Sequence, residues 1–300
     1  MNKQLQLLEK SRIRTSFDAA ADHYDDVAIL QREIGNRMLE RLDLVKLQPE
    51  IILDIGAGTG VCTHLLGKRY TKSCVIAFDL APNMLKHARQ RCGFFQKFFS
   101  KRHFLCGDVE LLPLADNSVD FIFSNATLQW CADLDHTFSE LKRVLRPGGL
   151  LMFSTFGPDT LKELRQSWNA ADINTNGPAG EAAVHVNDFI DMHDIGDAML
   201  RASFSDPVMD VENFILTYPD VYQLMRELKT LGAHNVANNR RHTLTGKTRI
   251  KKMVAAYETL RIDGNLPVTY EVVYGHAWAP EVKNSDVSIP LEQLQPGIRR

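Results

Sequence analysis

Three aspartates in the first part of this sequence, Asp54, Asp79 and Asp108, lie near the ends of apolar runs. A glycine-rich loop follows the first of them. Asp54 lies within Ile51-Ile-Leu-Asp-Ile, and Gly-Ala-Gly-Thr-Gly60 comes directly after it. Glycines let the main chain approach a ligand closely, because no Cβ is in the way. A carboxylate beside them repels a pyrophosphate and attracts a cation. These residues predict a binding loop for a small cofactor that carries positive charge.

The spacing of the glycines separates this loop from two common nucleotide-binding loops. The dinucleotide loop has the pattern G-x-G-x-x-G, whereas here the pattern is G-x-G-x-G, and Val61 stands where the third glycine would fall. No Lys-Ser or Lys-Thr pair follows, which excludes a phosphate-gripping P-loop. The residues after the loop, 60–69, are predicted to open a helix whose first amides face the ligand.

The elements that must position these residues alternate between strand and helix patterns. After the first strand and helix come a strand at 74–79, a helix at 81–90 and a strand from 102. A strand at 121–124, a helix at 134–146 and a strand at 150–155 complete the series. The helix is expected to end at Arg146-Pro-Gly-Gly149, a stop signal. Five such strand–helix units predict an α/β fold with a parallel, doubly wound sheet.

The two ends of the chain are predicted to be mainly helical. Residues 4–46 have helical spacing, in which Phe17 and Tyr24 are seven positions apart and share a face. The second half is expected to contain a helix after Asp159 or Thr160 as cap, a helix at 187–202 and two helices within 220–262. Strands are expected at 207–218 and 269–278, and residues 281–300 are predicted to be a mobile tail.

Composition excludes several classes of protein. The 300 residues carry a formal net charge of -2, which gives no overall electrostatic case for nucleic acid or membrane binding. No apolar run approaches the ~20 residues that span a bilayer. The N-terminus lacks the apolar core of a secretory signal. Five cysteines without C-x-x-C spacing argue against a disulfide framework or a zinc site and suggest a reducing cytoplasm.

The order of the motifs resembles the class I S-adenosylmethionine-dependent methyltransferases, a Rossmann-like fold. The matching segments are D-I-G-A-G-T-G at 54–60, F-D at 78–79, G-D-V at 107–109, N-A-T-L-Q-W at 125–130 and L-R-P-G-G at 145–149. The resemblance implies S-adenosyl-L-methionine as cofactor and S-adenosyl-L-homocysteine as product. It also implies a seven-stranded, mostly parallel sheet with an antiparallel edge strand and a helical cover from about 157–202 and 219–262.

The same resemblance assigns roles to individual residues. The loop contributes Asp54, Gly56, Ala57 and Gly58. Asp79, about twenty residues on, falls where a ribose-binding carboxylate is expected. The full set implied to bind the cofactor is Tyr24, Asp54, Gly56, Ala57, Gly58, Asp79, Leu80, Met84, Asp108, Val109 and Asn125. Asp108 and Val109 would clamp the adenine, and Tyr24 would act as a lid from the N-terminal helix, although Tyr24 is equally explained by helix packing.

Segments of the second half resemble the BioC family, the malonyl-[acyl-carrier protein] O-methyltransferases of biotin synthesis. They are F-G-P-D-T-L-K-E-L-R at 156–165, H-V-N-D-F-I-D-M-H-D-I-G-D at 185–197, L-G-A-H-N at 231–235, L-T-G-K at 244–247 and Y-E-V-V-Y-G-H-A-W at 270–278. The resemblance runs from about Arg12 to Trp278 and suggests one domain over residues 1–280.

Membership would imply methyl transfer to the free carboxylate of malonyl-acyl carrier protein or malonyl-CoA, which primes pimeloyl synthesis. Two alternatives stay open. The F-G-P-D-T-L-x-E-L-R segment also occurs in a complex I assembly factor that hydroxylates protein arginines, and the chain could be a non-catalytic assembly protein that binds the cofactor. The G-A-H-N, L-T-G-K and Y-G-H-A-W segments favour the first interpretation.

This chemistry needs no general base or metal, because a carboxylate is already a nucleophile at neutral pH. It does need a partner for the malonyl charge, since an unpaired buried charge is unfavourable. Arg165, on the helix after the fifth strand, is the first candidate, and Tyr24 the second. Arg165 could equally be an ordinary surface residue.

A stretch between Leu228 and Tyr257 has no acidic residue and is rich in basic ones. It is either a solvated helix face or a docking surface for the acidic carrier protein. The candidate docking residues are Arg240, Arg241, Lys247, Arg249, Lys251 and Lys252. RNA is disfavoured because no aromatic residues are interleaved with the charges. We expect a monomer.

Overall fold

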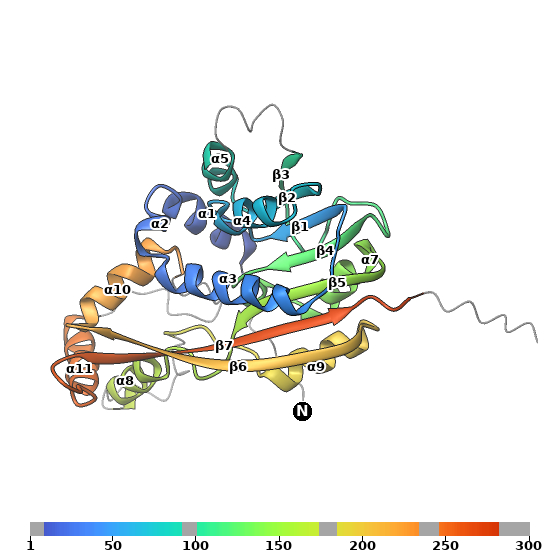
Figure 1. The fold of residues 1–300 in the computed structure, drawn as a ribbon. Coiled ribbons are helices and arrows are strands. Elements are labelled where there is room, and N and C mark those ends of the chain that lie inside the picture. The colour runs from blue at the N-terminus through green and yellow to red at the C-terminus, as the bar shows by residue number, and fades with distance from the viewer. Residues whose placement is uncertain (1–8, 92–100, 174–184, 234–245, 282–300) are drawn as a thin grey trace, which may run out of the picture.

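A seven-stranded sheet forms the centre of the molecule (Figure 1). The computed structural model describes residues 9–91, 101–173, 185–233 and 246–281, so the tail expected at 281–300 lies almost wholly outside the described residues. The strands are β1 (Ile51–Ile55), β2 (Cys74–Asp79), β3 (Arg102–Cys106), β4 (Val119–Ser124), β5 (Leu145–Phe156), β6 (Ser205–Tyr218) and β7 (Leu266–Trp278).

The strand order confirms the predicted fold class. The order is β3-β2-β1-β4-β5-β7-β6. Strands β1 to β5 pair in parallel. Strand β7 runs antiparallel to both β5 and β6 and so forms the antiparallel edge together with β6. The order reverses between β1 and β4, and ligands of open α/β sheets bind at the carboxyl ends of the strands at such a point.

Helices cover both faces of the sheet. They are α1 (Lys10–Ala20), α2 (Tyr24–Val27), α3 (Ile29–Arg41), α4 (Val61–Arg69), α5 (Pro82–Arg91), α7 (Leu134–Val144), α8 (Lys162–Ile173), α9 (Met192–Arg201), α10 (Val221–Thr230) and α11 (Lys247–Glu258). Figure 1 shows α8, α10 and α11 gathered at one end of the molecule. No helix within the described ranges is long and apolar enough to span a membrane.

Strand β4 shows how the sheet receives helices on both sides. Phe121 and Phe123 belong to one buried cluster, with Ile34 of α3, whereas Ile122 belongs to a second, with Phe138 of α7. Successive side chains of a strand point to opposite faces, so a strand buried on both faces is a continuous apolar run. This alternation explains the run Val119–Ser124 and fixes the parallel strands between two helical layers.

Several predicted element boundaries are wrong. Residues 4–46 do not form one helix: α1 ends at Ala20, so Phe17 and Tyr24 lie on different helices. The aspartates of this segment bond elsewhere, since Asp18 accepts a hydrogen bond from the main-chain N–H of Asn83 and Asp25 accepts one from Thr59 Oγ1. The helix expected at 187–202 begins only at Met192.

Two further errors concern the links between strands. Strand β5 begins at Leu145 and includes the expected stop signal, because Gly148 N–H bonds to Ala279 O beside the sheet. The link from β3 to β4, residues 107–118, contains no helix, so the series of strand–helix units is interrupted there. Arg143 holds this loop by donating to the carbonyls of Leu112 and Leu114.

Candidate active site

The glycine-rich loop connects β1 to α4 and has little room for side chains. Gly56, Gly58 and Gly60 have φ angles of 65°, 54° and 81°, in the left-handed region that favours glycine. A Cβ on Gly56 would lie 1.9 Å from Thr127 Oγ1, whereas one on Gly58 would meet no atom closer than 4.0 Å. Gly56 is therefore required by packing, and Gly58 borders open space.

Two acidic side chains lie beside this loop. Asp54 is buried and accepts a hydrogen bond from Thr63 Oγ1. Asp79 accepts hydrogen bonds from the N–H groups of Gly58 and Ala81, each 2.8 Å long. Burial raises the pKa of Asp54 to about 7 and that of Asp79 to about 6. Neither carboxylate forms a salt bridge within the described ranges, so this site favours a cationic ligand.

Two adjoining pockets border the loop, and we call them together the glycine-loop cavity. Their volumes are about 90 and about 50 Å³, and both are lined by Tyr24, Gly56, Gly58 and Asn125. The structure brings all eleven predicted cofactor-binding residues to this cavity: Tyr24, Asp54, Gly56, Ala57, Gly58, Asp79, Leu80, Met84, Asp108, Val109 and Asn125.

Three more polar residues line this cavity, Asp108, Asn125 and Tyr24, and each has a different environment. Asp108 forms a 2.9 Å ion pair with Lys10 of α1. Asn125 uses its whole carboxamide: Nδ2 donates to Gln31 O at 2.8 Å, and Oδ1 accepts from Ser154 Oγ at 2.9 Å. Burial, with lesser contributions from the nearby aspartates, raises the pKa of Tyr24, so its phenol remains protonated and can donate a hydrogen bond.

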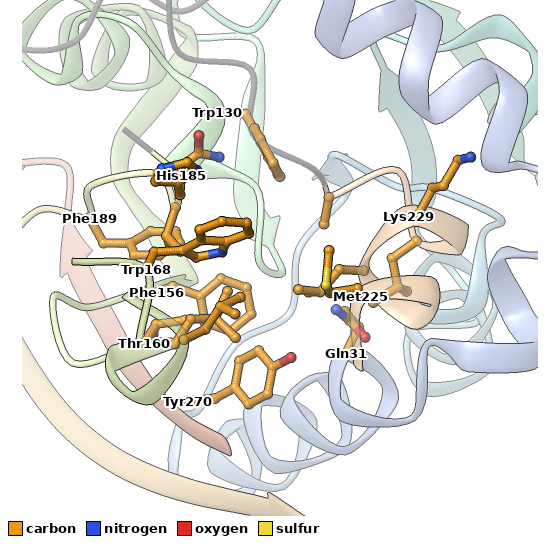
Figure 2. Close-up of a pocket in the computed structure, with 17 residues that line it drawn as sticks. Gln31, Trp130, Phe156, Thr160, Trp168, His185, Phe189, Met225, Lys229 and Tyr270 are labelled. Atoms are coloured by element: carbon orange, nitrogen blue, oxygen red, sulfur yellow. The ribbon is translucent and has the colours of Figure 1, made fainter. Parts of the chain in front are cut away.

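A second cavity, which we call the aromatic cavity, lies next to the first (Figure 2). Its volume is about 200 Å³, and most of its wall is aromatic or aliphatic. Trp130 lines both this cavity and the glycine-loop cavity, and so does Gln31. The two cavities therefore meet at these two side chains.

One polar residue of the aromatic cavity, His185, is held in place by contacts with its neighbours. The His185 ring stacks on Trp168 with 4.1 Å between ring centroids and 7° between planes. His185 Nε2 lies 3.0 Å from Asp172 Oδ2, and Asp172 Oδ1 lies 3.0 Å from Arg249 Nε of α11. This chain of contacts joins α8, α11 and the segment that follows residue 184 around one wall.

Arg165, the first candidate for the malonyl clamp, does not line either cavity. Its guanidinium donates to the main-chain carbonyls of Pro158, Thr160 and Asn187 at 2.9, 3.2 and 3.3 Å. Because Thr160 and Asn187 do line the aromatic cavity, Arg165 supports its wall from behind.

Several cavity residues were not expected from the sequence. Lys10, Gln31, Trp130 and His185 line the cavities, although Trp130 and His185 lie in motifs that carried the resemblance. For Trp130 and His185, membership of these motifs was the only signal in the sequence. Residue spacing does not indicate that side chains a hundred positions apart line one cavity. No group of three or more metal-ligating side chains occurs in the part of the chain that the structure describes.

The fold and these motifs have clear relatives. A methyltransferase domain model matches residues 53–153. The YcgJ protein of Bacillus subtilis has a TM-score of 0.55 at 18% identity, covering 82% of this chain and 99% of that chain. Phosphoethanolamine N-methyltransferase 2 of Haemonchus contortus, in complex with S-adenosyl-L-methionine, has a TM-score of 0.50 at 20% identity, covering 82% and 52%. At such identities the likeness concerns the fold alone.

Sequence relatives are more informative because they extend over the cover helices. The malonyl-[acyl-carrier protein] O-methyltransferase of Methylovorus sp. (strain MP688) is 52% identical over 285 residues, which covers 94% of this chain and 93% of that protein. The enzyme of the same name from Nitrosospira multiformis is 46% identical over 290 residues, covering 93% and 92%. The chain therefore belongs to the malonyl-[acyl-carrier protein] O-methyltransferase family.

Proposed function

We propose that this protein transfers a methyl group from S-adenosyl-L-methionine to the free carboxylate of malonyl-acyl carrier protein. The observation that carries the proposal is the pairing of two cavities. One presents two carboxylates without a basic partner in the described ranges, and the other is aromatic and opens onto it at Trp130 and Gln31. The relatives of this chain are named malonyl-[acyl-carrier protein] O-methyltransferase.

The residues present fit the cofactor. Its sulfonium and ammonium groups are cations, which Asp54 and Asp79 would attract. Gly58 leaves space for a ligand against the main chain. Asp79 would hold the ribose and Asp108 the adenine, and Asp108 would exchange its bond to Lys10 for one to the adenine amine. Tyr24 would cover the cofactor while donating a hydrogen bond.

The chain's own task is positioning. When bound, S-adenosylmethionine supplies an activated methyl group, and a carboxylate oxygen forms the new O–C bond as the C–S bond breaks with its electron pair left on sulfur. No proton moves, so no general base is needed. The walls hold the acceptor in line and exclude water, which supplies up to roughly 7–11 kcal/mol in favourable cases. A low-polarity wall also favours a step in which two opposite charges disappear.

The aromatic cavity is the proposed place for the malonyl thioester and the end of its pantetheine arm. Trp130 and Phe156 would pack on the acyl part, and Thr160 and Asn187 offer polar contacts. Arg165 would act as a positioning residue, because it fixes the main chain of the last two. The methyl ester product has no charge at its end, so fatty-acid enzymes can extend it towards pimeloyl for biotin.

For the carrier protein we propose docking on the exposed side of α11. Lys247 and Lys251 are exposed there. Arg249, by contrast, is only 17% exposed and is paired with Asp172, so it belongs to the contacts behind the cavity wall and not to the docking surface. Arg240 and Arg241 lie outside the described residues.

The described cysteines, Cys62, Cys74, Cys106 and Cys131, are free thiols, as a cytoplasmic enzyme would have.

A mass-shift assay tests the proposed function. The protein is incubated with S-adenosylmethionine and malonyl-acyl carrier protein, and the carrier protein is weighed by mass spectrometry. We expect a gain of one methyl group on the malonyl form and none on an acetyl form, which lacks a free carboxylate. Cofactor binding without a mass gain on malonyl substrates would favour the non-catalytic alternative. Hydroxylation of a protein arginine would favour the assembly-factor alternative, which the names of the relatives do not support.

A further inference from the structure

Gln31 of α3 stands where the two cavities meet and has an unused side chain. It lines the aromatic cavity and also the pocket that contains Asp54 and Tyr24. Its Oε1 atom is buried without a hydrogen-bond partner in the described residues. A buried amide without a partner is unfavourable by about 1–3 kcal/mol. The carboxamide is therefore not engaged by other described side chains, and its nitrogen is available to a ligand at the junction of the two cavities.

The main chain of Gln31 is fixed, in contrast to its side chain. Gln31 O accepts the 2.8 Å hydrogen bond from Asn125 Nδ2, which ties α3 to the end of β4. Leu30 and Ile34 on the same helix are buried in the core. The helix therefore presents the carboxamide at a defined place without using it for structure, which is the arrangement expected of a ligand-binding residue.

Two other polar groups of the aromatic cavity, Lys229 and His185, are less suited to the acceptor carboxylate. Figure 2 shows the ammonium of Lys229 pointing away from the cavity, and His185 on the side opposite Gln31. His185 is also engaged with Asp172. The Tyr270 hydroxyl is directed toward the side on which Gln31 lies (Figure 2). Of these cavity groups, Gln31 is the one that also borders the pocket of Asp54.

We propose that Gln31 holds the acceptor carboxylate by donating from Nε2 to one of its oxygens, which leaves the other oxygen facing the methyl group. Figure 2 shows the carboxamide nitrogen of Gln31 directed toward the cavity, so Nε2 can donate in the orientation that the structure has. A neutral donor suits this role, because a cation would stabilise the carboxylate more strongly and lower its nucleophilicity. This inference rests on the proposed function and names its acceptor-positioning residue.

The test compares Gln31→Leu with Gln166→Leu, the same change at an exposed site on α8. Malonyl-CoA serves as the substrate, so that carrier docking does not contribute. For Gln31→Leu we expect kcat/KM to fall ~10- to 100-fold, as for the loss of one hydrogen bond to a charged group. Binding of malonyl-CoA to enzyme filled with S-adenosylhomocysteine, measured by calorimetry, should weaken, while affinity for S-adenosylhomocysteine stays unchanged. Gln166→Leu should match the wild type in all three.

Two further variants make the test decisive. Gln31→Glu places a negative charge beside the acceptor, so its activity should fall further than that of Gln31→Leu and recover as the pH is lowered. Gln31→Asn keeps the amide but shortens its reach, and it replaces the leucine variant if that one fails to fold. Unchanged kcat/KM in a folded Gln31 variant, or an equal loss of S-adenosylhomocysteine affinity, would overturn the proposal. Absence of wild-type turnover would instead refute the proposed function.

Discussion

Single residues decide whether the glycine loop can form. Gly56 combines a left-handed φ of 65° with Thr127 so close that no Cβ fits. Thr127 Oγ1 in turn donates to Ile55 O at the end of β1, so it has little freedom to move. The loop is therefore shaped by a contact between β1 and the segment after β4.

We expect Gly56→Ala to destabilise the protein more than a backbone effect alone explains. Gly264→Ala is the matched control, since Gly264 has a φ of 79° but no atom within 4 Å of the place that a Cβ would take. The control should lower the free energy of unfolding by about 1–2 kcal/mol, the usual penalty of the left-handed region. Gly56→Ala adds overpacking of about 1–3 kcal/mol and should also weaken S-adenosylhomocysteine binding. Equal urea midpoints for the two variants would contradict this interpretation of Gly56.

At the scale of elements, α11 has one side engaged in contacts with α8 and one side exposed. Arg249 points to Asp172 of α8 and joins the contact chain that ends at His185 and Trp168. Lys251, two residues on, is exposed. Residues two apart on a helix do not share a face, so a run of basic residues in sequence is divided between wall and surface.

Charge reversal at these two sites separates docking from structure. Lys251→Glu should raise the apparent KM for malonyl-acyl carrier protein and leave that for malonyl-CoA unchanged, because rim charges mainly affect encounter with the partner. Arg249→Glu should impair both substrates and lower the free energy of unfolding by about 3–5 kcal/mol, since it leaves Asp172 facing a like charge. Steady-state kinetics with both substrates and urea unfolding give the comparison. An equal effect of Lys251→Glu on both substrates would count against docking on α11.

At the scale of the whole molecule, the ligand site weakens the ligand-free fold. Two adjacent aspartates are held beside the glycine loop without a basic partner in the described ranges, and burial raises the pKa of each. A carboxyl whose pKa is higher in the folded than in the unfolded state binds more protons when folded. The stability that these two carboxyl groups contribute therefore falls as the pH rises from their unfolded pKa values to their folded ones.

We expect the contribution of Asp54 and Asp79 to the free energy of unfolding of the ligand-free protein to decrease between about pH 4 and pH 7. Asp54, with a folded pKa of about 7, contributes roughly 4 kcal/mol of this decrease. Asp54→Asn keeps the hydrogen bond from Thr63 and removes the charge, so its stability should depend less on pH and exceed that of the wild type at pH 8. Asp194→Asn, at an exposed site on α9, is the control. A wild-type pH slope in Asp54→Asn would contradict the assignment.

Sequence alone determined the sheet and the residues that line the glycine-loop cavity, because those residues follow one another at the ends of successive strands. Parallel strands bring their carboxyl ends to one edge, so Asp54, Asp79 and Asp108 had to meet once the strand order was recognised. The helix breaks near Ala20 and the start of β5 at Leu145 were not predictable, since both depend on hydrogen bonds to distant segments.

Only the tertiary structure decided what lines the aromatic cavity. Gln31, Trp130 and His185 come from three separate parts of the chain, and no local pattern relates them. It also placed Arg165 behind the cavity wall and turned Arg249 inward, although both have the charge expected of a ligand-binding or docking residue. Residue type follows from the sequence, but the direction of a helical side chain depends on which face the neighbouring elements cover. The glycine-loop cavity was thus a matter of strand order, and the aromatic cavity a matter of how the cover helices pack.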